Sequence, residues 1–181
     1  MNKSEKYAAV LPQVKALCEG EEDMIAKMAN VAALLHHEFG FWWTGFYRVQ
    51  KSEVGSQRSK VTDAEATSDL QPPISDLLLG PFQGPIACVH IAYGRGVCGT
   101  AWKDRRTIVV PDVEKFPGHI ACSSESRSEI VVPVFKDSHN DTLTHSHNQE
   151  VIAVLDIDSR ELATFDDTDS RWLEEVVKYI P

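Results

Sequence analysis

The chain has 181 residues, 43% of them hydrophobic and 25% charged, which is typical of one globular domain. Its formal net charge of −9 disfavours nucleic-acid binding, because phosphate contacts need clustered lysines and arginines. No apolar run is long enough to cross a bilayer, and the N-terminus lacks the pattern of a secretory signal. We therefore expect a cytoplasmic protein without membrane contact.

Two amphipathic helices are expected within residues 4–40. Apolar side chains recur at helical spacing over residues 4–19, although Pro12 argues against an uninterrupted helix there. Cys18 ends this segment and is interpreted as a small buried hydrophobic residue. The second helix should begin near Glu21 and end at a glycine. Its apolar face is expected to consist of Ile25, Met28, Ala29, Ala32 and Leu35.

The rest of the chain predicts a run of strands, one short helix over residues 100–103 and a final helix over residues 166–180. A turn is expected over residues 80–85. The fold class is α/β of the α+β type, with five or six mainly antiparallel strands, the terminal helices on one face and the cysteine loops on the other. The expected strands are 41–49, 77–79, 87–92, 106–110, 130–135 and 151–159.

Two polar segments, residues 51–76 and 136–150, are expected to be mobile insertions. The first contains no aromatic residue and is rich in Ser, Thr, Asp and Lys. The second carries His139, His145 and His147 among other polar residues. These histidines lack a hydrophobic anchor, so we assign them no metal-binding role.

The first strand carries aromatic residues on alternate positions. Alternation places Trp43, Gly45 and Tyr47 on one face, and Thr44 and Phe46 on the other. The glycine between two aromatic walls would leave a slot the width of a small side chain. The alternative interpretation is that these aromatic residues are simply core.

Three cysteines and three carboxylates are candidates for chemistry. Cys88, Cys98 and Cys122 lie in turns that carry Gly or His, and Glu129 follows the last of them; Cys88 and His90 should share one strand face. Cys98 should lie at a helix N-terminus, where backbone amides favour a thiolate. Asp156 and Asp158 are two residues apart on a strand and should point the same way, so they need partners or a ligand.

Six segments occur in order along the chain, and together they resemble the sequence pattern of the free methionine-R-sulfoxide reductases, a family of GAF-domain enzymes. The resemblance covers nearly the whole chain outside the two predicted insertions. One segment alone is a weak signal, but the ordered set is specific. The segments are WTGFY (43–47), LGPFQG (79–84), GRGVCG (94–99), GHIAC (118–122), SEIVVP (128–133) and LDID (155–158).

This resemblance implies a single GAF domain over residues 1–181, often assembled as a homodimer. It implies reduction of the R epimer of free methionine sulfoxide, with Cys122 as the attacking cysteine. Cys88 and Cys98 match the cysteines that resolve or relay the redox-active disulfide. The implied electron donor is thioredoxin with its NADPH-dependent reductase, and no bound cofactor or metal is implied.

The resemblance also assigns the polar and aromatic residues of a substrate site. Glu129, Asp156 and Asp158 match the acidic residues that bind the substrate amino group and hydrogen-bond the sulfoxide oxygen. Trp43 and Tyr47 match the aromatic pocket around the methyl sulfide. The chemistry needs these residue types, because the sulfoxide oxygen must gain a proton from an acid, and Glu129 or the Asp156/Asp158 pair could supply it.

Two other functions stay open from the sequence. A GAF domain can be a sensor that binds a small ligand without chemistry, since fold alone does not decide function. A zinc site could instead be built from Cys88, His90, His119 and Cys122, although no C-x-x-C pair is present and Cys98 would be left unexplained.

Overall fold

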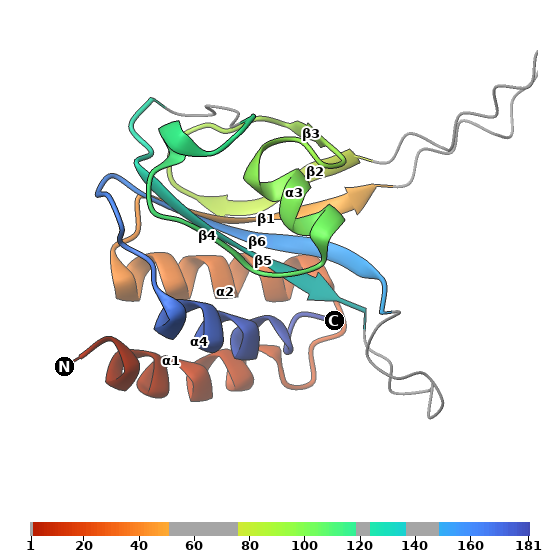
Figure 1. Ribbon diagram of the computed structural model, residues 1–181. Coiled ribbons are helices and arrows are strands. Elements are labelled where there is room, and N and C mark those ends of the chain that lie inside the picture. The colour runs from red at the N-terminus through yellow and green to blue at the C-terminus, as the bar shows by residue number, and fades with distance from the viewer. Residues whose placement is uncertain (1, 51–75, 119–123, 137–148) are drawn as a thin grey trace, which may run out of the picture.

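The computed structural model describes residues 2–50, 76–118, 124–136 and 149–181, and they form an antiparallel sheet with helices on both faces (Figure 1). The six-stranded sheet has the order β3-β2-β1-β6-β5-β4, which confirms the predicted α+β architecture. Its strands are β1 (Trp43–Gln50), β2 (Asp76–Gln83), β3 (His90–Ala92), β4 (Ile108–Val110), β5 (Ser128–Phe135) and β6 (Val151–Ser159). The helices are α1 (Lys3–Cys18), α2 (Met24–Phe39), α3 (Gly96–Asp104), the 3-10 turn η1 (Val113–Lys115) and α4 (Asp167–Val177).

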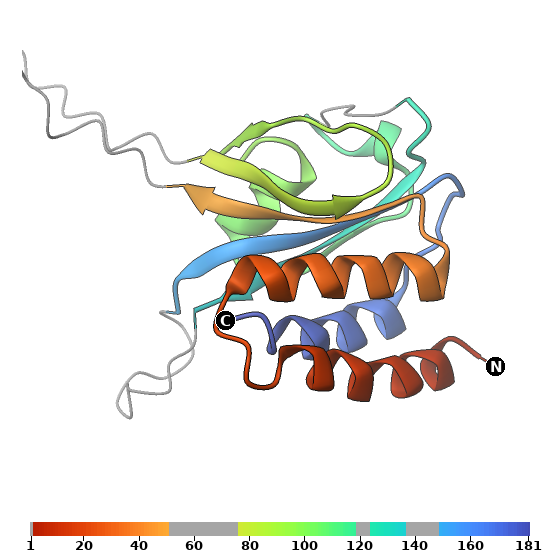
Figure 2. The ribbon, with the colours of Figure 1, turned by 180° about the vertical axis from the view of Figure 1, so that it is seen from behind.

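Three helices cover one face of the sheet, while α3 lies on the opposite face, as Figures 1 and 2 show from two sides. Helices α2 and α4 pack directly on the strands and α1 packs on both of them. The two faces bury separate cores because successive strand side chains point to opposite sides. Phe46 of β1 belongs to the core beneath α2 and α4, whereas Trp43 and Tyr47 belong to the core beneath α3. The predicted alternation along this strand is confirmed.

The N-terminal helices differ from the sequence prediction in three details. Helix α1 continues through Pro12, and its buried side carries Tyr7, whose hydroxyl donates to Asp169 of α4 at 2.9 Å. Helix α2 begins after Asp23, whose carboxylate caps the first turn by accepting from the backbone amide of Ile25. Ile25, predicted on the buried face, is 38% exposed. The buried positions of α2 include Met28, Val31, Ala32 and Leu35.

Residues 80–83 form the end of β2, so the predicted turn over this segment is wrong. The pairing of β1 with β2 shifts register between Gly45 and Tyr47, and the bulge absorbs Pro81, which cannot donate to a regular ladder. Gly80 is needed at this crossing, because a Cβ there would lie 2.9 Å from the carbonyl oxygen of Phe46.

The cysteine-bearing segment after β2 also differs. Strand β3 has three residues, so Cys88 precedes the strand and does not share a strand face with His90. His90 is exposed, with Nδ1 2.6 Å from a carboxylate oxygen of Asp76. Helix α3 begins at Gly96, earlier than predicted, and Cys98 is its third residue.

Parts of the sequence prediction lie outside the described residues. These are His119, Cys122 and most of the two predicted insertions (51–75 and 137–148). Within the described ranges, none of the helices has the length and apolar character of a membrane span.

Candidate functional site

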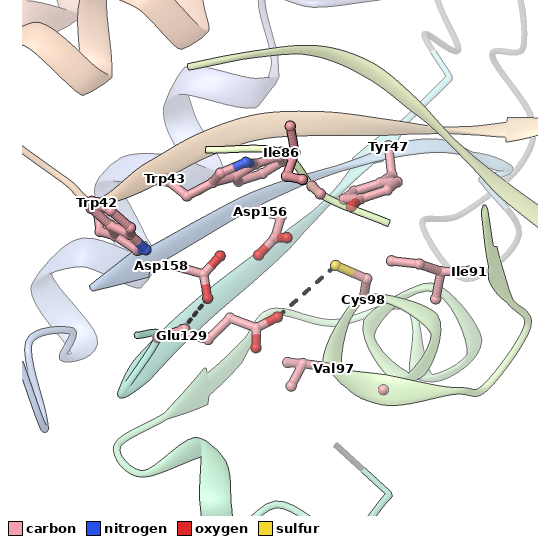
Figure 3. A pocket seen from close by; sticks show the side chains of 13 residues that line it. Trp42, Trp43, Tyr47, Ile86, Ile91, Val97, Cys98, Glu129, Asp156 and Asp158 are labelled. Atoms are coloured by element: carbon pink, nitrogen blue, oxygen red, sulfur yellow. Dashed lines mark hydrogen bonds between the residues drawn. The ribbon is translucent and has the colours of Figure 1, made fainter. Parts of the chain in front are cut away.

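A small pocket lies between the sheet and α3, under the segment that precedes β3 (Figure 3). Strands β1, β5 and β6 supply its polar and aromatic floor, and α3 supplies the facing wall. The lining residues are Trp42, Trp43, Tyr47, Ile86, Ala87, Ile91, Gly96, Val97, Cys98, Ser126, Glu129, Asp156 and Asp158.

Strand register brings the three carboxyl groups together. Glu129 of β5 pairs directly with Asp158 of β6, and Asp156 lies two residues earlier on the same strand. Side chains two residues apart share a sheet face, and directly paired residues across adjacent strands share it too. All three carboxyl groups therefore enter the same pocket, as the alternation of Asp156 and Asp158 predicts.

Cys98 meets this carboxyl cluster from α3. Its Sγ lies 4.0 Å from Oε1 of Glu129, and its side chain is 3% exposed. Burial raises the pKa of the Cys98 thiol well above its usual value, and the nearby Asp156 and Glu129 raise it further. The prediction of a thiolate at this helix start is therefore wrong, because desolvation and negative neighbours outweigh the backbone amides.

The carboxyl groups are also shifted toward their protonated forms. Burial raises the pKa of Glu129 and of Asp156 well above the usual range, with further contributions from neighbouring carboxylates. Burial raises the pKa of Asp158 to about 6, although the Ser126 hydroxyl, which donates to Asp158, opposes this shift. Oδ1 of Asp156 is buried and has no hydrogen-bond partner among the described residues. The cluster can thus hold protons at neutral pH and donate them to a ligand.

The aromatic wall is built around the ring of Trp43. This ring stacks on Tyr47 and Phe82, with ring centroids 5.9 and 5.4 Å away. A Cβ on Gly45 would lie 2.4 Å from the Trp43 ring. The glycine therefore makes room for Trp43, and the open slot predicted above it is filled by that ring. Trp43 and Tyr47 both line the pocket, as the resemblance implies.

Trp42 is a pocket residue that the sequence did not single out. It precedes β1, so strand alternation does not place it opposite Trp43, and both side chains line the pocket. Arg160 lies over its ring, with the guanidinium carbon 3.3 Å from the centroid, and forms an ion pair with Glu125 at 2.6 Å. Ser126 is a second lining residue that sequence alone could not identify, because it comes from an irregular segment before β5.

The cysteines occupy different chemical states. Cys88 is disulfide-bonded, whereas Cys18 and Cys98 are free thiols. Cys18 is 6% exposed, which confirms its interpretation as a buried hydrophobic residue. The predicted nucleophile, Cys122, lies outside the described residues.

Cys98, Glu129 and Asp156 could in principle hold a divalent cation, since one ligand atom from each lies within 4.8 Å of the others. Without a cation, burial favours the protonated form of all three groups, so a bound cation would have to displace their protons. The alternative zinc set of Cys88, His90, His119 and Cys122 lacks one ligand in this state, because Cys88 is disulfide-bonded and has no thiolate to offer.

Comparison with known proteins gives a consistent assignment over the full chain. A sequence model described as GAF domain matches residues 23–180. "GAF domain-containing protein A" of Dictyostelium discoideum is 45% identical over 179 residues, covering 99% of this chain and 92% of that protein. Free methionine-R-sulfoxide reductase of Saccharomyces cerevisiae is 35% identical, covering 99% of this chain and 86% of the yeast protein.

A solved structure supports the same relationship. The X-ray structure of free methionine-R-sulfoxide reductase from Neisseria meningitidis in complex with its substrate superposes with a TM-score of 0.77 at 42% identity. The match covers 99% of this chain and 89% of the Neisseria chain. The chain therefore belongs to the GAF domain family and is a homologue of the free methionine-R-sulfoxide reductases.

Proposed function

We propose that the protein reduces free methionine-R-sulfoxide to methionine. The observation that carries this proposal is the convergence of three carboxyl groups on one pocket, beneath the rings of Trp43 and Tyr47. The full-length similarity to reductases that act on free methionine-R-sulfoxide supports the same substrate.

In the proposed reaction, the thiol of Cys122 attacks the sulfoxide sulfur. The oxygen passes to the cysteine, so that one thiol and one sulfoxide become one sulfenic acid and one methionine. A second thiol then condenses with the sulfenic acid, which forms a disulfide and releases water. The disulfide-bonded state of Cys88 supports Cys88 as the resolving residue. The raised pKa of the Cys98 thiol argues against Cys98 as the nucleophile.

The carboxyl cluster would supply the acid for this step. The sulfoxide oxygen needs a proton as the sulfur is attacked, and a carboxyl group with a raised pKa still carries one near neutral pH. Glu129 is the proposed donor, since burial raises its pKa well above the usual range, while Asp158, whose pKa is raised only to about 6, is the proposed partner of the substrate ammonium. Asp156 would complete the polar floor, where its buried Oδ1 has no hydrogen-bond partner among the described residues.

The same cluster would select a free amino acid. An ionised member of the cluster can pair with the α-ammonium of free methionine sulfoxide, whereas a methionine sulfoxide within a polypeptide has no such charge. Among the described residues, neither a lysine nor an arginine lines the pocket. The proposed pocket therefore discriminates between the free and the peptide-bound substrate by charge.

Thioredoxin, recycled by its NADPH-dependent reductase, is the proposed electron donor, because a disulfide product requires an external dithiol. We also propose a cytoplasmic homodimer, as the family resemblance implies. A ligand sensor without chemistry is the competing function, favoured by the match to GAF domains, whose fold alone implies no reaction.

The test is coupled turnover with thioredoxin, thioredoxin reductase and NADPH, using the separated epimers of free methionine sulfoxide. We expect NADPH oxidation with the R epimer and little with the S epimer or with a peptide that contains methionine sulfoxide. Equal rates on both epimers would contradict the assignment. Binding of methionine sulfoxide without any turnover would favour the sensor.

A further inference from the structure

Most of the side-chain hydrogen-bond donors that line the pocket already donate to acceptors within the protein. Nε1 of Trp43 donates to the carbonyl oxygen of Pro85 at 3.1 Å, and the Tyr47 hydroxyl donates to that of Cys88 at 2.9 Å. The Ser126 hydroxyl donates to Asp158. Nε1 of Trp42 is buried and has no hydrogen-bond partner among the described residues. An indole N–H has no acceptor capacity, so its partner must be an acceptor atom.

An unpaired buried donor is uncommon in folded proteins, because the group loses its water without gaining a partner. The Trp42 ring is nevertheless held in place from outside the pocket. The Arg160 guanidinium stacks on it, and Glu125 anchors that guanidinium. A cation over an indole face is a stable arrangement, and here it places a positive charge behind the ring.

The kind of side chain that lines the pocket changes from one end to the other (Figure 3). Trp42 lies at one end, beside Asp158, while Cys98, Tyr47 and Ile91 lie toward the other end. Glu129 and Asp156 lie between these ends. A ligand with an acceptor at one terminus, a cationic group next to it and an apolar group at the other terminus matches this order.

We propose that the Trp42 end of the pocket is a subsite for the α-carboxylate of an amino-acid ligand, with Trp42 Nε1 as the donor. This inference rests on the proposed function, because it takes free methionine sulfoxide as the ligand. The α-ammonium of the ligand then lies between its own α-carboxylate and the side chain of Asp158. Its positive charge limits the repulsion between these two carboxylates. Arg160 acts as a positioning residue, since it holds the ring rather than lining the pocket.

The test compares two substrates on two variants. Trp42→Phe removes the N–H and keeps an aromatic ring under Arg160. Trp172→Phe is the matched control, because Trp172 lies on α4, outside the pocket, with Nε1 3.2 Å from Oγ of Ser4. The substrates are R-configured methionine sulfoxide and 3-(methylsulfinyl)propan-1-amine of the same sulfur configuration, which lacks the carboxylate.

We expect Trp42→Phe to lower kcat/KM for methionine sulfoxide roughly tenfold, mainly through KM, as the loss of a hydrogen bond to a charged group implies. The same variant should leave kcat/KM for the amine unchanged, and Trp172→Phe should change neither. A proportional loss on both substrates would show that Trp42 only shapes the pocket and would overturn the proposal. No loss on either substrate would overturn it as well.

Two further measurements test the carboxylate subsite even if the Trp42→Phe variant does not fold or the protein is not a reductase. If Trp42→Phe does not fold, the parent protein must still prefer methionine sulfoxide over the amine by at least about tenfold, and equal values would overturn the subsite. If the parent shows no turnover, calorimetric titration measures the binding affinity for both compounds and tests the contact between Trp42 and the α-carboxylate in that way. Weaker binding of methionine sulfoxide alone in Trp42→Phe then supports the subsite although the proposed reaction fails. No binding of either compound to the parent overturns both.

Discussion

Glu129 and Asp158 lie directly opposite each other on adjacent antiparallel strands, and both side chains face the same buried pocket. Burial raises the pKa of each carboxyl group, because an ionised form in this position loses solvent, and the neighbouring Asp156 and Asp158 raise the pKa of Glu129 further. The protein thus keeps acids close together, and no lysine or arginine lines the pocket in the part of the chain that the structure describes. Such a cluster is suited to a cationic ligand and to proton transfer.

Replacing Asp158 with Asn should affect activity more than stability. The variant keeps the size of the side chain but removes one charge and one proton, so we expect kcat/KM for methionine-R-sulfoxide to fall roughly a hundredfold. The melting temperature of the ligand-free protein should stay equal or rise, because a like-charge contact is removed. Paired kinetics and thermal unfolding check both expectations. Asp156→Asn is the companion variant, and unchanged kinetics in both would remove these residues from the substrate site.

The raised pKa of Asp158 predicts a stability that falls as pH rises. The folded state binds a proton more tightly than the unfolded state, so the contribution is complete below the usual aspartate pKa of 3.8 and is lost as pH passes about 6. The loss amounts to at most about 3 kcal/mol, and to less where solvent reaches this partly exposed side chain. Urea unfolding between pH 4 and pH 7 should show this slope in the parent and a flatter one in Asp158→Asn.

Asp166 provides a control of opposite sign. Its hydrogen bond with Lys3 lowers the pKa of the carboxyl to about 2, so its contribution is present above the usual aspartate pKa and is lost as pH falls toward 2. Asp166→Asn should therefore change the curve below about pH 4 and leave the slope between pH 4 and pH 7 intact. Identical slopes for the parent and Asp158→Asn would show that Asp158 does not titrate as described.

The four cysteines should separate into distinct roles. Cys122→Ser should abolish turnover and sulfenic-acid formation, whereas Cys18→Ser should change neither, because Cys18 is buried beneath the helices. The Cys98 thiol should react slowly with iodoacetamide at pH 7, since its raised pKa leaves little thiolate. Activity assays and mass spectrometry of trapped thiols check these outcomes. Full activity of Cys122→Ser would transfer the nucleophile to Cys98.

Gly45 should resist substitution for a steric reason. A Cβ at this position would lie 2.4 Å from the Trp43 ring and 2.5 Å from Cβ of Phe82, so Gly45→Ala must displace the aromatic wall. We expect a loss of roughly 1–3 kcal/mol in the free energy of unfolding, together with a raised KM. Gly20→Ala is the control, because an added Cβ there would have no described atom within 4 Å beyond its chain neighbours, and only the positive φ of 78° opposes the change. That control should lose stability without any change in KM.

Local sequence patterns predicted the features that depend on strand alternation. The split of Trp43 and Tyr47 from Phe46, and the common direction of Asp156 and Asp158, follow from a period of two. The state of Cys98 could not be predicted in this way. Its burial and its carboxyl neighbours come from β5 and β6, which approach α3 only in the folded chain.

Segments that break regular patterns were harder to predict. Gly80 and Pro81 favour a turn locally, yet pairing with β1 keeps them in a strand by means of a bulge. Trp42 lies just before β1, where alternation no longer decides which way a side chain points. Its place in the pocket depends on tertiary packing, because Arg160, which follows β6, lies over its ring.

The most direct test of the account is a single turnover without any electron donor. The fully reduced protein is mixed with a small excess of free methionine-R-sulfoxide, and both methionine and protein thiols are quantified. We expect one methionine per chain and the loss of two thiols, with a disulfide that includes Cys88 and leaves Cys18 free. Bound methionine sulfoxide that is recovered unchanged, with every thiol intact, would contradict it.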